Sequence, residues 1–345
     1  MTNLLEWTVL EPSTLGSERP LLEVKDLKTY FYVDEGTLKA VDGVSFAVNR
    51  EETLGLIGES GCGKSVTALS VLRIVPSPGR LVGGKILLHL DGEPIDLAEL
   101  NPSGSEIRNI RGKEISMVFQ EPMTSLSPVH TIGNQIREAI LLHRTNDRQE
   151  AQDIALDMLN RVGMPNPTQR INEFPHQLSG GMRQRAMIAM ALSCHPKLLI
   201  ADEPTTALDV TVEAQILDLI KELQERFRMA VLYITHDLGV IAEVSERVAV
   251  MYLGKIVEYG SVRDIFHRPL HPYTGLLLKS RPRLIGGTGE RLESIRGTVP
   301  VPLNLPQRCR FYDRCPQAIE GRCNRAVPEL IEKADGHWVR CFLYE

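Results

Sequence analysis

Two glycine-rich stretches of this chain combine residue types that bind phosphate. The first, Gly58–Ser65, reads Gly-Glu-Ser-Gly-Cys-Gly-Lys-Ser. Its glycines allow backbone N–H groups to wrap around phosphate oxygens, the lysine neutralises their charge, and the serine hydroxyl is a magnesium ligand. A strand-like run, Thr53–Ile57, precedes this stretch and a helical run, Val66–Leu72, follows it. This context is the one that a nucleotide-phosphate loop requires. We expect nucleotide contacts from Ser60, Gly61, Cys62, Gly63, Lys64, Ser65 and Val66.

The second stretch, Leu178–Arg185, places two glycines after Ser179 and before a helical run. Backbone N–H groups at such a helix start can face an anion without steric hindrance. A chain with two phosphate-binding elements binds two phosphates, or it shares one nucleotide with a neighbouring molecule.

Within the first stretch, Cys62 is interpreted as a small residue that fills the loop. A thiol acidified by the helix N-terminus is the alternative.

Carboxylates follow an apolar run further along the chain. Lys197–Asp202 ends in Asp202, and Glu203 comes next. Asp202 is suited to hold magnesium, directly or through water, and Glu203 to orient and polarise an attacking water. An acidic pair after a strand is commonly only solvated, but the adjoining Pro204–Asp209 favours function here. His236 follows the run Val231–Thr235, at the strand end where open α/β sheets place their ligands.

Strand-like and helical runs alternate around these residues, which predicts an α/β fold with a largely parallel sheet. The expected strands are Leu21–Phe31, Leu38–Val48, Thr53–Ile57, Ile115–Phe119, Leu198–Ala201 and Val231–Thr235, with a late hairpin of Val248–Tyr252 and Lys255–Tyr259. Helical spacing of apolar residues marks Ile154–Val162 and Val212–Phe227. Residues 1–20 are predicted to be a flexible tail, residues 21–267 the main domain and residues 268–345 a proline-rich extension with four cysteines.

Composition limits the possible classes of protein. The chain has 345 residues, 43% of them hydrophobic, and a net charge of −5. It contains no apolar run of the roughly 20 residues that cross a bilayer, and no secretory signal is recognisable. Because the net charge is negative and the chain has no long basic block, nucleic acid is not expected as the main partner. Six cysteines without a signal peptide indicate a reducing compartment, so we expect a cytoplasmic protein.

Taken together, the motifs resemble those of the nucleotide-binding subunit of an ATP-binding-cassette (ABC) transporter. In order they are GESGCGKS, Gln120, LSGGMRQR, LLIADEP, TALD and His236, and the resemblance covers about residues 21–267. It implies a P-loop NTPase core of ABC type with an antiparallel β subdomain and a helical subdomain at about 121–185. Met123–Pro128 and the helices up to Pro175 would receive a coupling helix of the membrane subunit.

The same resemblance implies roles for individual residues. Gln120 would sense magnesium and γ-phosphate, and His236 would contact the γ-phosphate. Ser179, Gly180 and Gly181 would close over the nucleotide of a partner subunit, next to a D-loop of Ala207, Leu208 and Asp209. Magnesium ligands would be Ser65, Gln120 and Asp202, and catalysis would rest on Glu203, His236 and Gln120. Phe31 (or Tyr30) would stack on adenine, although two aromatics near a strand end are as often core.

The last part of the extension, residues 309–345, contains four cysteines: Cys309, Cys315, Cys323 and Cys341. Four thiolates can hold zinc or an iron–sulfur cluster, and their spacing alone does not choose. The stretches His271–Thr274, Gly297–Pro300 and Cys309–Pro316 resemble the C-terminal extension of dipeptide and oligopeptide permease ATPases, a group that includes nickel importers. This resemblance implies a four-iron four-sulfur cluster, with zinc as the alternative. Gln307-Arg308 stands where the family usually has Pro-Gly.

The same extension contains five arginines, and a solvated basic face is the favoured interpretation of them: Arg308, Arg310, Arg314, Arg322 and Arg325.

The resulting hypothesis is an ATP-hydrolysing subunit of an importer for di- and oligopeptides, peripheral on the cytoplasmic side of the inner membrane. Implied partners are two membrane-spanning permease subunits, a paralogous ATPase subunit (or a second copy of this chain) and, indirectly, a solute-binding protein. Import of nickel or another small solute is one alternative. The other is a cassette protein that acts as a nucleotide-driven switch outside transport, on ribosomes or DNA. The single cassette and the absence of a long heptad insert oppose this second alternative.

Overall fold

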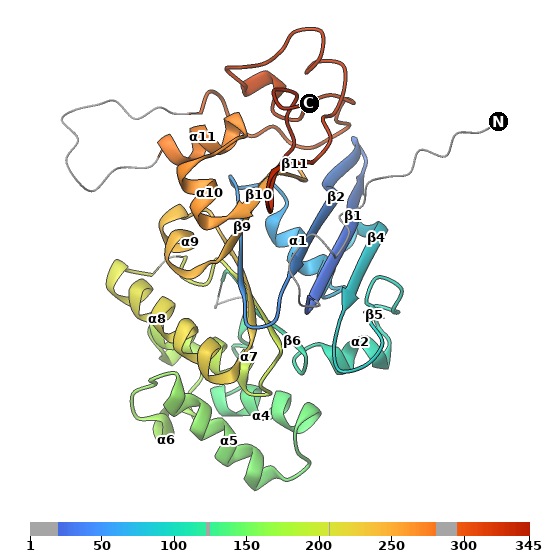
Figure 1. Cartoon of the computed structure of the whole chain (residues 1–345). Coiled ribbons are helices and arrows are strands. Elements are labelled where there is room, and N and C mark those ends of the chain that lie inside the picture. The colour runs from blue at the N-terminus through green and yellow to red at the C-terminus, as the bar shows by residue number, and fades with distance from the viewer. Residues whose placement is uncertain (1–19, 122–124, 207, 281–294) are drawn as a thin grey trace. The chain divides into compact units, whose positions relative to one another are not determined.

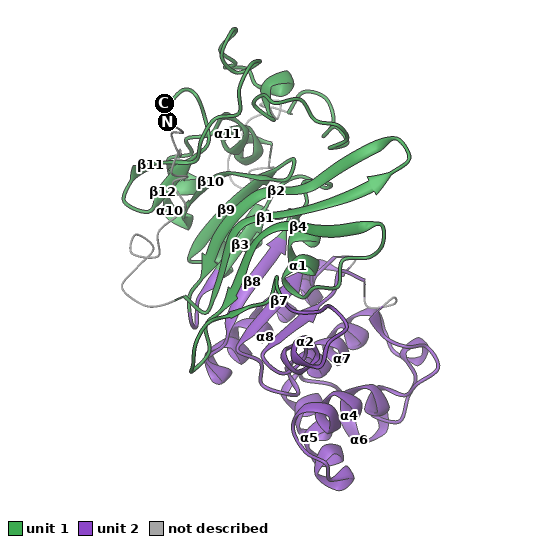
Figure 2. Ribbon diagram, turned by 90° about the vertical axis from the view of Figure 1, so that its right-hand side faces the viewer, with its two compact units in different colours: residues 1–49, 54–99, 235–345 green, residues 50–53, 100–234 purple. Residues whose placement is uncertain are grey.

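The computed structural model describes residues 20–121, 125–206, 208–280 and 295–345. Contacts divide the chain into two compact units, which are considered separately below (Figure 2). Unit 1 comprises residues 1–49, 54–99 and 235–345, and unit 2 comprises residues 50–53 and 100–234. Residues 1–19 of the predicted flexible tail, residues 123 and 124 of the Met123–Pro128 segment and Ala207 lie outside the described residues.

Unit 1 contains an antiparallel sheet with the strand order β2-β1-β4-β5. Its strands are β1 (Leu22–Val33), β2 (Gly36–Val48), β4 (Gly79–Leu88) and β5 (Ile95–Asp96). The long strand β1 pairs with β2 on one side and β4 on the other, as Figure 1 shows. Apolar residues of all three long strands are buried, among them Val24, Phe46 and Ile86. The antiparallel β subdomain that the resemblance implied is therefore present.

The second sheet of unit 1 has the order β11-β12-β10-β9-β3. Its strands are β3 (Thr53–Ile57), β9 (Arg247–Tyr252), β10 (Lys255–Ser261), β11 (Ile331–Ala334) and β12 (His337–Val339). Strand β3 runs parallel to β9, and β9 and β10 form the predicted hairpin. The helices of this unit are α1 (Lys64–Val71), α9 (Leu238–Val244), α10 (Val262–His267) and α11 (Pro272–Lys279).

The C-terminal extension adds two strands that the sequence did not predict. Strand β12 pairs with β10 of the main domain, and β11 pairs with β12. Both strands are so short that alternation of apolar and polar residues cannot identify them. Contacts group residues 268–345 with unit 1, and the predicted boundary after His267 remains a prediction.

Unit 2 consists of three parallel strands and a group of helices. The strands β6 (Ile115–Val118), β7 (Leu198–Asp202) and β8 (Ala230–Thr235) are adjacent in the order β8-β7-β6. The helices are α2 (Ser105–Ile110), α4 (Ile132–His143), α5 (Arg148–Arg161), α6 (Pro167–Arg170), α7 (Gly180–Leu192) and α8 (Val210–Phe227). Helices α4, α5 and α7 pack against one another, as the helical subdomain requires.

The two predicted helical faces are buried over most of their length. On α8 the buried residues include Ile216, Ile220 and Leu223, and on α5 they include Met158 and Leu159. In the described part of the chain, no helix has the length and apolarity needed to cross a membrane.

Candidate functional site

The first glycine-rich stretch forms a loop between β3 and the N-terminus of α1 in unit 1. Gly63 caps α1 with a φ of +101°, and Gly58 has a φ of +153°. A Cβ atom would lie 2.1 Å from the Ala40 carbonyl oxygen at Gly63 and 2.2 Å from the Met251 carbonyl oxygen at Gly58. At Gly61 nothing lies within 4 Å. Close backbone packing thus requires two of the glycines, and the third borders open space.

Lys64, the first residue of α1, turns its ammonium group toward this loop. Its Nζ donates hydrogen bonds to the Gly58 carbonyl at 2.8 Å and the Glu59 carbonyl at 3.1 Å. The side chain of Cys62 is buried, and burial raises the pKa of its thiol. Cys62 therefore fills the loop as expected, since a buried neutral thiol is a poor nucleophile.

Tyr30 and Phe31 occupy neighbouring positions on β1, so their side chains leave opposite faces of the sheet. The hydroxyl of Tyr30 donates to Asp42 Oδ1 at 2.6 Å, and burial together with this carboxylate raises the pKa of Tyr30. Phe31 packs beside Gly79 and Val75, which follow α1 in the chain. Phe31 thus lies beside the segment that follows α1, whereas Tyr30 makes a hydrogen bond to Asp42.

In unit 2, Gln120 and Glu203 follow neighbouring parallel strands. Val118 at the end of β6 pairs with Ala201 of β7, so residues two positions further lie side by side at the carboxyl edge. Gln120 Nε2 donates to Glu203 Oε2 at 3.0 Å. Thr206 Oγ1 donates to the same carboxylate oxygen at 3.0 Å. The carboxylate of Glu203 is therefore held by two donors.

The backbone of Glu203 is also constrained. Its N–H donates to the Ile234 carbonyl of β8 at 2.8 Å, and its φ is +46°, which is uncommon for a non-glycine residue. Such conformations persist where the surrounding structure fixes them, and they cluster at functional sites. Asp202, the last residue of β7, is buried at the same edge.

The second glycine-rich stretch begins helix α7. Ser179 is the N-cap and its Oγ accepts a hydrogen bond from the Met182 N–H at 3.3 Å. Gly180 and Gly181 form the first turn, and a Cβ atom on Gly181 would lie 2.9 Å from Val212 of α8. Asp209 caps α8 by accepting from the Val212 N–H at 2.9 Å. The second glycine-rich stretch thus contacts α8, the helix that the predicted D-loop residue Asp209 caps.

His236 lies immediately after β8 and is assigned to unit 1. Its side chain is exposed, at the carboxyl end of the strand as predicted. The next residue, Asp237, caps α9 by accepting from the Gly239 N–H at 2.6 Å.

The four C-terminal cysteines share one neighbourhood in unit 1. Burial, followed by the presence of the other thiols, raises the pKa values of Cys309, Cys315 and Cys341 to about 11. The Cys309 N–H donates to the Cys323 carbonyl at 3.0 Å. Across the described residues, however, no three His, Cys, Asp or Glu side chains are arranged to hold a metal ion. The geometry thus gathers four soft sulfur donors without converging them on a single ion.

Two of the C-terminal arginines do not form a solvated face, and for them this interpretation was wrong. The side chains of Arg310 and Arg314 are only 4% and 7% exposed. Arg310 pairs with Asp42 of β2, and Arg314 pairs with Glu59 of the phosphate loop. Their acidic partners lie more than 250 positions away in the chain, and no local pattern in the sequence indicates such a pairing.

Two family models match the chain. The model of the ABC transporter family matches residues 41–206, and the model of the oligopeptide/dipeptide transporter C-terminal region matches residues 257–323. The oligopeptide transport ATP-binding protein AppD of Bacillus subtilis is 51% identical over 326 residues, which are 94% of this chain and 97% of the relative. The dipeptide transport ATP-binding protein DppD of Escherichia coli is 46% identical over 93% of this chain and 96% of its own length.

Solved structures with the same fold include ABC transporter cassettes. A dimeric structure of the bacterial cassette MJ0796 is 27% identical with a TM-score of 0.61, covering 70% of this chain and 99% of that chain. A dimeric post-hydrolysis state of the same cassette with ADP and Pi has a TM-score of 0.62, with the same identity and coverage.

Proposed function

Because this chain belongs to the ATP-binding subunits of ABC transporters, in the branch with the oligopeptide/dipeptide C-terminal region, we propose that it powers the import of short peptides. Two observations support the choice of cargo. Residues 257–323 match the oligopeptide/dipeptide transporter C-terminal region, and the chain is 51% identical to an oligopeptide transport ATP-binding protein over 94% of its length. The cassette itself binds and hydrolyses ATP.

The residues of unit 1 fit the phosphates of ATP. Gly61 borders open space, the N–H groups at the start of α1 favour negative charge, and Lys64 supplies a cation within the loop. Ser65 is the proposed magnesium ligand of this unit. Phe31 is the proposed adenine platform, because Tyr30 is held by Asp42.

The residues of unit 2 fit the hydrolytic step. Glu203 is the proposed general base, and its carboxylate oxygen already accepts hydrogen bonds from Gln120 and Thr206. Asp202 and Gln120 are the proposed magnesium ligands of this unit. His236 is proposed to contact the γ-phosphate from unit 1. Magnesium, when bound, would neutralise charge that develops on the phosphate oxygens.

The second glycine-rich stretch, with Ser179, Gly180 and Gly181, is proposed to cover the nucleotide of a second ATPase subunit. Support comes from the position of Ser179 at the N-terminus of α7 and from the dimeric state of the cassette MJ0796. We propose a related but distinct ATPase subunit as the partner, with two membrane-spanning permeases and a solute-binding protein completing the importer. The complex would place this chain on the cytoplasmic side of the inner membrane.

We further propose that Cys309, Cys315, Cys323 and Cys341 hold a four-iron four-sulfur cluster. Support comes from their closeness: the pKa values of Cys309, Cys315 and Cys341 are raised by burial and by neighbouring cysteines. Among the described residues, no three metal-ligating side chains are arranged for a single ion. A cluster bonds each cysteine to a different iron, so its ligands lie further apart than those of one zinc ion. When bound, the cluster would supply bonds that tie residues 309–323 to Cys341.

Peptide import is tested by deleting the gene in its host and measuring uptake of radiolabelled dipeptides and longer peptides, alongside nickel. The deletion is complemented with the native chain or with the Glu203→Gln variant as an inactive control. We expect peptide uptake to return with the native chain only. Loss of nickel uptake with normal peptide uptake would refute the proposed cargo.

The cluster is tested on protein purified without oxygen, by iron and zinc analysis and by electron paramagnetic resonance after reduction. We expect about four irons per chain, and their loss in a Cys315→Ser variant. Cys194→Ser is the matched control, because Cys194 lies in unit 2. Zinc without iron, from cells supplied with both metals, contradicts the assignment.

A further inference from the structure

The segment Arg310–Arg314 of the C-terminal extension contacts the phosphate loop and its surroundings. It lies between Cys309 and Cys315 and includes the 3-10 turn Tyr312–Arg314. Arg310 and Arg314 point from this segment to acidic residues of the nucleotide-binding core. None of the roles proposed above uses these two side chains.

Arg314 makes a two-pronged ion pair with the second residue of the phosphate loop. Its Nη1 lies 2.7 Å from Glu59 Oε2 and its Nη2 lies 2.9 Å from Glu59 Oε1. Its Nε donates to the Arg296 carbonyl at 2.8 Å, and its Nη2 also donates to the Gly297 carbonyl at 3.2 Å. A planar guanidinium held in this way fixes the direction as well as the distance of the carboxylate.

The backbone of Glu59 is held by a second group from outside the loop. Its N–H donates to the hydroxyl oxygen of Tyr273, on α11, at 2.8 Å. The ring of Tyr273 packs against Phe311, with 5.3 Å between centroids, and against Tyr252, with 4.7 Å. Phe311 belongs to the same segment as Arg314. The segment therefore supports both the side chain and the main chain of Glu59.

Glu59 is in turn a partner of the phosphate-binding lysine. Its carbonyl oxygen accepts a hydrogen bond from Lys64 Nζ at 3.1 Å, beside the Gly58 carbonyl at 2.8 Å. A continuous path thus runs from Arg314 through Glu59 to Lys64. A change in the position of Glu59 would move the carbonyl that holds the ammonium group of Lys64.

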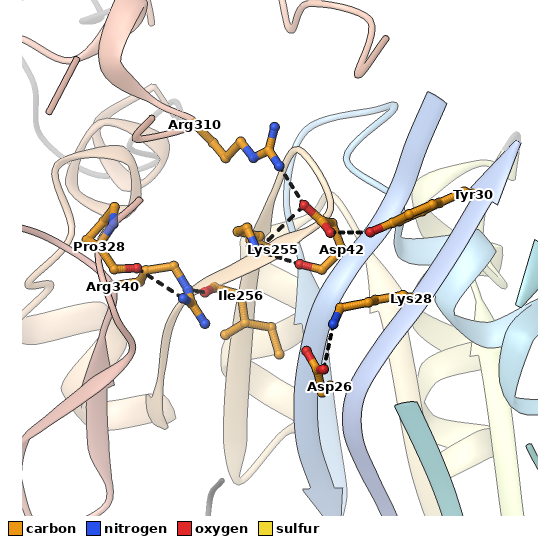
Figure 3. Close-up of polar contacts among 9 residues, drawn as sticks. All are labelled: Asp26, Lys28, Tyr30, Asp42, Lys255, Ile256, Arg310, Pro328 and Arg340. Atoms are coloured by element: carbon orange, nitrogen blue, oxygen red, sulfur yellow. Dashed lines mark hydrogen bonds and ion pairs between the residues drawn. The ribbon is translucent and has the colours of Figure 1, made fainter. Parts of the chain in front are cut away.

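Arg310 contacts Asp42 of strand β2, as Figure 3 shows. Its Nη2 lies 2.5 Å from Asp42 Oδ2, while Tyr30 donates to Asp42 Oδ1 at 2.6 Å and Lys255 Nζ donates to the Asp42 carbonyl at 2.5 Å. Asp42 is two residues from Ala40, whose carbonyl packs against Gly63 of the loop. The same C-terminal segment therefore contacts the loop at Glu59 and also contacts β2, which packs against the loop at Gly63.

We propose that Arg314 is a positioning residue for nucleotide binding, which acts through Glu59 on Lys64, so that the C-terminal segment sets the affinity for ATP. The inference rests on the ATP-binding part of the proposed function and does not depend on the cargo. It is measured on the purified full chain, without transport.

The first experiment compares Arg314→Met with Arg308→Met. Arg308 lies in the same region but pairs with Asp313, whose side chain is 63% exposed. For Arg314→Met we expect the Kd of a fluorescent ATP analogue and the KM for ATP to rise about tenfold, with kcat at saturating ATP unchanged. Arg308→Met should keep native values. A purely structural role would lower the active fraction, hence kcat, and leave KM unchanged, which would overturn the proposal.

The second experiment tests the path through Glu59. We expect Arg314→Met, Glu59→Gln and the double variant to show similar affinities, because the pair acts as one unit. Effects that multiply would refute the path. Tyr273→Phe removes the acceptor of the Glu59 N–H and keeps the ring, so it tests the proposal even if Arg314→Met does not fold; an unchanged Kd in folded Tyr273→Phe would count against it. A native chain that binds ATP normally while its host imports no peptide would refute only the proposed cargo.

Discussion

Gln120 and Glu203, which lie 83 positions apart, are joined by a hydrogen bond of 3.0 Å between amide nitrogen and carboxylate oxygen. The parallel pairing of β6 with β7 determines this contact. Val118 lies opposite Ala201, and Gln120 and Glu203 each follow two residues later along the same polypeptide. The proposed sensor of magnesium and the proposed general base are therefore adjacent. Any movement of the segment around Gln120 would therefore change the hydrogen bond to the Glu203 carboxylate.

Replacement of Glu203 by Gln should lower ATP turnover by about 100-fold or more, the range expected for loss of a general base. ATP binding should persist, because the neutral amide keeps the size of the side chain. Phosphate release and binding of a fluorescent nucleotide measure the two effects. Glu222→Gln, on the exposed side of α8, is the control. Unchanged hydrolysis would remove Glu203 from the catalytic role.

Gly63→Ala should destabilise the protein more than Gly61→Ala. Both glycines have positive φ, +101° and +80°, so each alanine is expected to cost about 1–2 kcal/mol for the left-handed conformation. At Gly63 the new Cβ would also lie 2.1 Å from the Ala40 carbonyl oxygen, whereas at Gly61 it meets nothing. Thermal unfolding of the two variants measures the difference. Equal melting temperatures would contradict the packing of the loop against β2.

Phe31→Ala should weaken ATP binding by about 10- to 100-fold, the usual effect of losing a base–aromatic stack. Tyr30→Phe should bind ATP almost normally, because it removes only the hydroxyl that donates to Asp42. Titration with ATP and with inorganic triphosphate separates the base from the phosphates, and triphosphate binding should be equal in both variants. The reverse order of ATP affinities would identify Tyr30 as the adenine platform.

Acid should destabilise unit 1 through His271. Burial lowers the pKa of His271 from 6.5 to about 4, and its Nδ1 accepts from the Tyr273 N–H. Between these pH values the unfolded chain binds a proton that the folded chain excludes. The free energy of unfolding should therefore fall by about 3 kcal/mol as pH decreases from 6.5 to 4.

His271→Asn should reduce this dependence, because asparagine can still cap α11 but does not titrate. The exposed His267 provides the control variant His267→Asn, which should keep the native pH dependence. Urea unfolding at several pH values measures it. A native slope in His271→Asn would exclude His271 as the cause.

The sequence by itself determined the motifs of the nucleotide site. Gly58–Ser65, Leu178–Arg185 and the acidic pair after Leu198–Ala201 are contiguous, and each combines a strand or helix end with the side chains that act there. Contiguous patterns of this kind follow from local backbone geometry and hydrophobic periodicity, so they can be recognised without the fold. Strand β3, the hairpin of β9 and β10 and helix α8 were predicted for the same reason.

Only the tertiary structure decided which distant residues meet. Arg314 and Glu59 are 255 positions apart, and nothing in the sequence near either residue distinguishes a buried ion pair from a solvated charge. Strand β12, of three residues, was invisible as a pattern because it is defined by pairing with β10 rather than by alternation. Long-range pairing depends on how strands and helices pack in the folded protein. The residues next to a charged side chain or a short strand therefore do not identify its distant partner.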